Sequence, residues 1–101
     1  KSKILPLQFN FLHRFDRIVN KLPKYYDLVI YVDCGAKSRI GIDIDENIKS
    51  INIDHHQSNN SFATINIVDS NKASSSELIY EFFEVNNLNI SEQTALCIYT
   101  G

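Results

Sequence analysis

The sequence is poor in residues that cross-link a small domain, because it has only two cysteines in 101 residues. Cys34 and Cys97 lie too far apart for a Cys-x-x-Cys metal site and are too few for a disulfide framework. We therefore expect two reduced cysteines, packed as small hydrophobic side chains in a cytoplasmic protein. The sequence also lacks an apolar run of about 18 residues and a signal-peptide pattern, so no membrane segment is expected.

An excess of charge of either sign is missing too, since the formal net charge is −2 at pH 7. Without a basic surface field, this region is not expected to bind long duplex DNA by releasing its counterions. If a phosphate compound is the ligand, bound divalent cations must attract it. The composition is that of an ordinary globular protein, with 44% hydrophobic and 22% charged residues. The length of 101 residues suits one domain.

Short apolar runs alternate with helical patterns along the chain. Residues 28–32 form a continuous β-branched and aromatic run that is typical of a strand buried on both faces. Residues 51–53 and 62–68 predict two more strands, and residues 1–13 an extended segment or loop. Apolar spacing predicts helices over 14–22, from Ser74 to about Asn86, and from Ser91 onward. This alternation predicts an α/β fold with a doubly wound parallel sheet.

Acidic and imidazole side chains follow two of these strands at the point where each strand ends. Asp33 comes directly after the run 28–32, and Asp54, His55 and His56 come directly after residues 51–53. Because the carboxyl ends of parallel strands meet at one edge of the sheet, we expect these side chains to lie together there.

Two neighbouring carboxylates repel each other unless cations or shared protons offset their charge. A mixed set of oxygen and imidazole ligands suits Mn²⁺, Fe²⁺ or Zn²⁺ better than Ca²⁺. The four groups fall short of the eight or so ligands that a pair of ions needs, so either one metal binds or further ligands lie outside this chain. An Asp after a strand also serves as a turn or helix cap, and this reading stays open for Asp33 alone.

A longer pattern surrounds these residues. Asp54-His55-His56, with Asp33-Cys34-Gly35 about twenty residues earlier, resembles the DHH family of phosphoesterases. The resemblance extends over most of residues 28–101, through Ser38-Arg39-Ile40-Gly41, Gln57-Ser58-Asn59 and the helix that starts near Ala73-Ser74-Ser75-Ser76-Glu77. It implies the hydrolysis of phosphodiester or phosphomonoester bonds in short oligonucleotides or nucleotides by a water that two Mn²⁺ ions activate.

The resemblance also implies roles for single residues. Asp33 would bridge the two Mn²⁺ ions, and His55 would bind one of them. His56 would contact the scissile phosphate of the substrate or assist proton transfer to the leaving group. Asp54 would orient a neighbouring ligand from behind, so that Asp54 and His56 form the catalytic pair.

Two family motifs have no counterpart in residues 1–101. The first, an HxxxDxD-like arrangement after a strand, is not matched by His13-Arg14-Phe15-Asp16, and the acid expected after Thr100-Gly101 is missing. We therefore expect residues 1–101 to be an incomplete DHH catalytic domain that lacks the C-terminal substrate-binding domain and is inactive alone. The compact spacing between the motifs favours the small-oligoribonuclease and pAp-phosphatase branch; a cyclic-dinucleotide phosphodiesterase and a RecJ-type single-strand exonuclease remain alternatives.

Two hypotheses outside this family remain open. In one, Cys34, His55 and His56 hold a structural Zn²⁺ in a non-catalytic binding module. In another, Asp33 is the acceptor of a flavodoxin-like regulatory domain, which leaves both histidines without a role. The substrate and the oligomeric state are not specified by the sequence.

Overall fold

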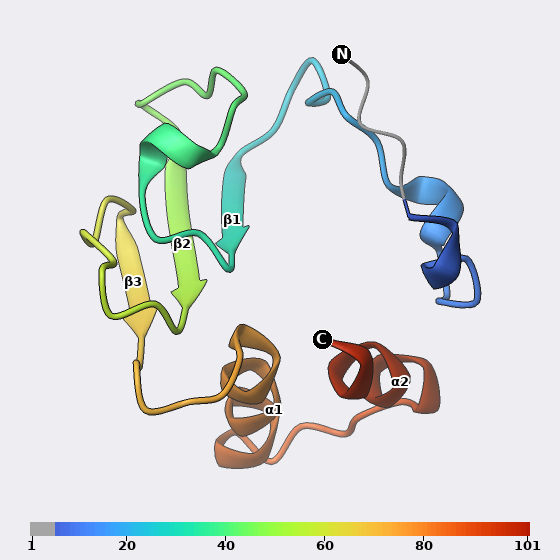
Figure 1. Ribbon diagram of the computed structural model, residues 1–101. Coiled ribbons are helices and arrows are strands. Elements are labelled where there is room, and N and C mark those ends of the chain that lie inside the picture. The colour runs from blue at the N-terminus through green and yellow to red at the C-terminus, as the bar shows by residue number, and fades with distance from the viewer. Residues whose placement is uncertain (1–5) are drawn as a thin grey trace.

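Three strands pair in parallel into one sheet in the computed structural model, which describes residues 6–101 (Figure 1). The strands are β1 (Leu28–Val32), β2 (Lys49–Asp54) and β3 (Ile65–Val68), and β2 lies in the centre. Ile51 is paired with Ile30 on one side and with Ile65 on the other. The predicted parallel α/β class is confirmed, with a longer second strand and a shorter third strand than expected.

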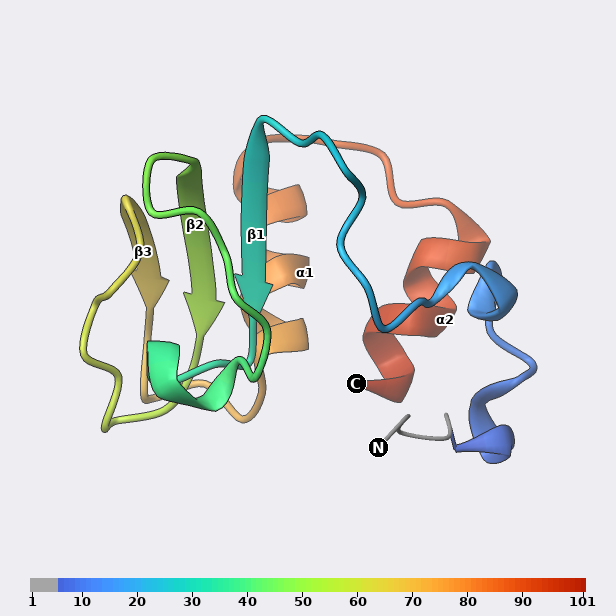
Figure 2. The ribbon, with the colours of Figure 1, turned by 90° about the horizontal axis from the view of Figure 1, so that it is seen from above.

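Helical segments lie on both sides of this sheet (Figure 2). The helix α1 (Ser75–Val85) packs against one face, and the short 3₁₀ helix η3 (Lys37–Arg39) lies over the opposite face. The second helix, α2 (Glu92–Thr100), contacts α1. Within residues 6–101, no helix combines the length and the apolar character that crossing a bilayer requires.

The ends of α1 follow the predicted signals. The Ser74 hydroxyl accepts a hydrogen bond from the Glu77 N–H at 3.3 Å, and the Glu77 carboxylate accepts one from the Ala73 N–H at 2.7 Å. At the other end, Asn87 adopts a left-handed conformation with φ 52°, and the Asn86 side chain donates to the Phe82 carbonyl. These caps fix where α1 begins, and therefore which of its residues face the sheet edge.

The predicted helix over residues 14–22 is wrong. This segment holds only the 3₁₀ helix η2 (Phe15–Arg17), which follows Arg14 in the left-handed region at φ 62°. Half of the predicted apolar stripe is not covered, since Ile18 is 53% and Val19 74% exposed, while Phe15 and Leu22 are half-buried. A short helix without tertiary packing is unstable in water, so the periodic pattern is not sufficient. The expected extended start is also replaced in part by η1 (Leu7–Phe9), while residues 1–5 lie outside the described part.

The sheet is only partly covered by this chain. The accessible surface of the chain is 8166 Å², which exceeds the roughly 5,800 Å² expected for a compact monomer of 11.6 kDa. Ile30 and Ile65, which share one face with Ile51, are each more than half exposed, and β1 forms an edge of the sheet. Among the described residues, Leu78 of α1 is the buried large hydrophobic side chain, with 7% exposure. The carboxyl edge of the sheet is nevertheless well ordered by hydrogen bonds.

Candidate metal centre

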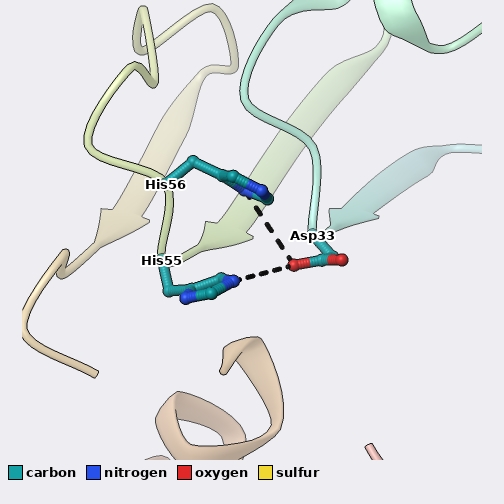
Figure 3. Close-up of side chains that lie close together, drawn as sticks. All are labelled: Asp33, His55 and His56. Carbon is teal, nitrogen blue, oxygen red and sulfur yellow. Dashed lines mark ion pairs between the residues drawn. The ribbon is translucent and has the colours of Figure 1, made fainter. Parts of the chain in front are cut away.

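The carboxyl ends of β1 and β2 bring the predicted site residues to one edge of the sheet. Asp33 continues the β1 ladder, because its N–H donates to the Ile53 carbonyl at 3.0 Å. Asp54 is the last residue of β2, and His55 and His56 leave the strand directly after it. The side chains of Asp33, His55 and His56 then turn toward a common point above α1 (Figure 3).

The three side chains that converge form a set of potential metal ligands. Asp33 Oδ1 lies 3.4 Å from Nε2 of His55 and 4.0 Å from Nδ1 of His56. One ligand atom from each residue lies within 4.8 Å of the others. Two donor atoms bound to one ion at about 2.1 Å are separated by roughly 3.0–3.4 Å, so the Asp33–His55 pair fits a shared ion. A carboxylate with imidazoles suits a first-row divalent metal.

Each histidine uses its Nδ1 atom for a bond within the protein. Nδ1 of His55 lies 3.3 Å from the Lys72 carbonyl oxygen, and Nδ1 of His56 lies 2.6 Å from Asp54 Oδ1. A carbonyl oxygen can only accept, so Nδ1 of His55 carries the proton and Nε2 keeps a free lone pair. The same reasoning applies to His56 opposite an ionised carboxylate. Both rings are therefore held in the tautomer that leaves Nε2 available, a common device around metal sites.

Asp54 lies under the site and does not face its opening. Its side chain is fully buried, and both of its oxygens accept hydrogen bonds, from His56 at 2.6 Å and from the Asn59 amide at 2.6 Å. Burial acts to raise the pKa of Asp54, but the hydrogen bonds from Asn59 and His56 outweigh it and lower the pKa below its usual value. Asp54 is therefore a buried anion that orients His56 from behind.

Asp33 is held by both its backbone and its side chain. Its φ of 59° is in the left-handed region, which Asp tolerates better than most residues. Its Oδ1 atom accepts a hydrogen bond at 3.0 Å from the hydroxyl of Ser75, a buried residue in the first turn of α1. The oxygen that faces His55 is thus fixed by a third structural element.

Other candidate residues lie apart from this cluster. The Cys34 thiol donates to the Ala36 carbonyl at 3.3 Å and does not belong to the ligand group found within residues 6–101. His13 is exposed and accepts a hydrogen bond from its neighbour Arg14. The acidic stretch 43–46 is solvent-facing, and its Glu46 pairs with Lys37.

Sequence reasoning missed the residues that orient the ligands. Asn59, Ser75 and the Lys72 carbonyl each contact a predicted site residue, yet none was assigned a role. Asn59 belongs to a polar loop and Ser75 to a helix-capping run, so both carry signals of ordinary loop and cap chemistry. Their contacts depend on how the loops fold back onto the sheet edge, which local patterns do not encode.

Comparison with known proteins extends these observations. Residues 3–101 match the model of the DHH family, N-terminal domain. The chain is 36% identical over 78 residues to a probable bifunctional oligoribonuclease and PAP phosphatase NrnA of Streptococcus mutans, covering 73% of this chain and 24% of that protein. Among solved structures, it resembles an exopolyphosphatase-related protein from Bacteroides fragilis with a TM-score of 0.64 and 32% identity, covering 74% of this chain and 24% of the other. The chain thus spans about a quarter of the length of these relatives.

Proposed function

Because this chain belongs to the DHH family, we propose that the protein carrying it is a Mn²⁺-dependent phosphoesterase that hydrolyses short oligonucleotides or nucleotides. The observation that carries the proposal is the convergence of Asp33 Oδ1 and His55 Nε2, 3.4 Å apart, at the carboxyl edge of a parallel sheet. Residues 1–101 supply part of the catalytic domain in this proposal, and the activity belongs to the whole protein.

Asp33 and His55 are the proposed metal ligands of this chain. Asp33 would bridge the two Mn²⁺ ions through its carboxylate, whose side chain is 61% exposed. Bound divalent ions would offset the phosphate charge and lower the pKa of water enough to yield a nucleophile near neutral pH. The ions would also attract an anionic substrate to a region whose own net charge is −2.

His56 and Asp54 are the proposed catalytic pair. With Nδ1 committed to Asp54, the Nε2 atom of His56 is left for the substrate. The bond from Nδ1 to Asp54 would hold the ring so that a proton on Nε2 is donated to a phosphate oxygen or to the leaving oxygen. His56 would thus bind the substrate phosphate and assist departure of the leaving group, while Asp54 keeps the ring in place.

Short substrates are favoured over long duplex DNA. The relative from Streptococcus mutans is named a probable oligoribonuclease and PAP phosphatase, and 36% identity over 78 residues supports a related substrate class here. The exposed residue Arg39 lines a shallow groove beside Asp33 at the edge of β1 and would offer a cation to a phosphate there. A cytoplasmic location is part of the same proposal.

The test uses the full-length protein, stripped of metal and titrated with Mn²⁺, Mg²⁺ and Zn²⁺. The substrates are an RNA dinucleotide, 3′-phosphoadenosine-5′-phosphate, a cyclic dinucleotide and long single-stranded DNA. Mn²⁺-dependent turnover of the first two, lost in Asp33→Asn and His55→Ala, is the expected result. Preferential cleavage of the cyclic dinucleotide or of long DNA would support the other family activities. Tight stoichiometric zinc whose removal unfolds the protein, without turnover, would support the binding-module reading instead.

A further inference from the structure

Asn59 has a side chain with three polar contacts, two of which reach the strand ends that carry the site. Its Nδ2 lies 2.6 Å from Asp54 Oδ2 and 3.3 Å from the Cys34 carbonyl oxygen. Its Oδ1 accepts the Ser61 N–H at 2.7 Å. These partners fix the direction of the amide, because a flipped carboxamide would place an oxygen against a carboxylate and an NH₂ group against an N–H.

We propose that Asn59 is a positioning residue of the site, which holds the Asp54 carboxylate in the orientation that presents Nε2 of His56 to the substrate. The role in turnover rests on the function proposed above. The role in orienting the ring rests on the contacts alone.

Each carboxylate oxygen of Asp54 accepts a hydrogen bond from a different side chain. Oδ1 accepts the Nδ1–H of His56, and Oδ2 accepts the amide of Asn59. The side chain has no exposure to water, so no solvent molecule at the surface replaces a lost donor. Without Asn59, Oδ2 of Asp54 loses its side-chain donor, and the carboxylate is no longer held in one orientation against the His56 ring. The imidazole then loses the single orientation that a directed hydrogen bond gives it.

A second effect of Asn59 is to join the two loops that carry the ligands. Its amide reaches the Cys34 carbonyl, one residue after Asp33, while its own loop follows His56. The adjacent backbone strengthens this link, because the Asn60 N–H donates to the Gly35 carbonyl at 3.1 Å. Asn59 also accepts from Ser61, whose backbone is in the left-handed region at φ 54°. One side chain therefore couples the distance between the loops to the direction of His56.

The test compares Asn59→Ala with Asn60→Ala in the full-length protein. Asn60 is the matched control because it is the neighbouring asparagine and its side chain is exposed. The first readout is the ring ¹⁵N chemical shifts of His56 in the metal-free protein, at a pH where the ring is neutral. The second is the division between kcat and KM for an RNA dinucleotide at saturating Mn²⁺.

In the wild type and in Asn60→Ala, we expect a single tautomer with the proton on Nδ1. In Asn59→Ala, we expect a mixture of tautomers and a fall in kcat of about 10–100-fold with a smaller change in KM. A folded Asn59→Ala protein that keeps the wild-type ring signature would overturn the proposal. If Asn59→Ala does not fold, the ring signature is measured in Asn59→Asp, which keeps the acceptor for the Ser61 N–H. An ionised Asp at this position cannot donate to Asp54, so a wild-type ring signature in the ionised variant would also overturn the proposal.

The ring signature is measured without metal or substrate, so it separates this proposal from the proposed function. A wild-type protein that hydrolyses none of the phosphate esters overturns the proposed function alone. A wild-type ring that is already a mixture of tautomers overturns the role of Asn59, whatever the activity.

Discussion

The hydroxyl of Ser75 donates a hydrogen bond to Asp33 Oδ1 at 3.0 Å, across 42 residues of sequence. This contact links the first turn of α1 to the end of β1, at the same oxygen that faces His55. The position of the proposed metal ligand therefore depends on a helix that follows a different strand. Any change that shifts the start of α1 is expected to disturb the site.

Removal of the Ser75 hydroxyl should weaken metal binding. In Ser75→Ala, Asp33 loses the donor that fixes Oδ1, and residues that orient metal ligands typically contribute 10–100-fold in affinity or activity. We expect the Mn²⁺ concentration for half-maximal activity of the full-length protein to rise by about tenfold. Ser76→Ala, one residue further along α1, is the control and should leave it unchanged. Equal Mn²⁺ dependence in both variants would show that Asp33 needs no support from α1.

The left-handed backbone of Asp33 makes a separate prediction about stability. Asp33→Gly and Asp33→Ala both remove the carboxylate, but only Gly adopts φ 59° without steric cost. The Gly variant should therefore be more stable than the Ala variant by about 1 kcal/mol in the metal-free protein. Urea unfolding in the presence of a chelator measures the difference. Equal stabilities would mean that the backbone at this position relaxes to an ordinary conformation when the carboxylate is absent.

The positions of residues that lie at strand ends could be predicted from the sequence. The ends of the apolar runs 28–32 and 51–53 placed Asp33, Asp54 and the two histidines at one edge, because parallel strands share that edge. The start and end of α1 also followed local rules at Ser74, Glu77 and Asn87. In each case a short stretch of sequence is sufficient to predict the position.

The positions of residues that depend on tertiary packing could not be predicted from the sequence. Helical spacing over 14–22 failed because Ile18 and Val19 have no described surface to pack on. The contacts of Asn59 and Ser75 arise only after two loops and α1 meet at the sheet edge. Hydrophobic periodicity and cap motifs describe one segment at a time, so they do not report which distant backbone or carboxylate a polar side chain reaches.

The cap of α1 gives a prediction about stability with little direct effect on the ligands. Ser74→Ala removes the acceptor for the Glu77 N–H and should lower the free energy of unfolding by about 1 kcal/mol, whereas Ser74→Gly should lower it by only a few tenths. Chemical denaturation of the full-length protein measures both. Because Ser75 follows directly, Ser74→Ala should also raise the Mn²⁺ requirement slightly. Equal losses in the Ala and Gly variants would argue against a capping role.

The lowered pKa of Asp54 predicts how stability changes with acid. Burial raises this pKa, but the hydrogen bonds from Asn59 and His56 lower it further, so the net shift is below the ordinary value of 3.8. A group whose folded-state pKa is depressed stabilises the protein above its unfolded-state pKa, and this contribution disappears as the pH falls through the folded-state pKa. Asn59→Ala removes one of the side-chain donors to Asp54. The variant should therefore be less stable than the wild type by about 1–3 kcal/mol at neutral pH.

The stability difference between wild type and Asn59→Ala should depend on pH in the acid range. As the pH falls below about 4, Asp54 is protonated in the unfolded chain first and in the folded protein only at lower pH, so the difference between wild type and Asn59→Ala should shrink there. Urea unfolding of the metal-free proteins at a series of pH values between neutral and acid measures it, and the carboxylates common to both proteins cancel. A difference in unfolding free energy that stays constant over this range would mean that the Asn59 amide stabilises the fold without acting on the charge of Asp54.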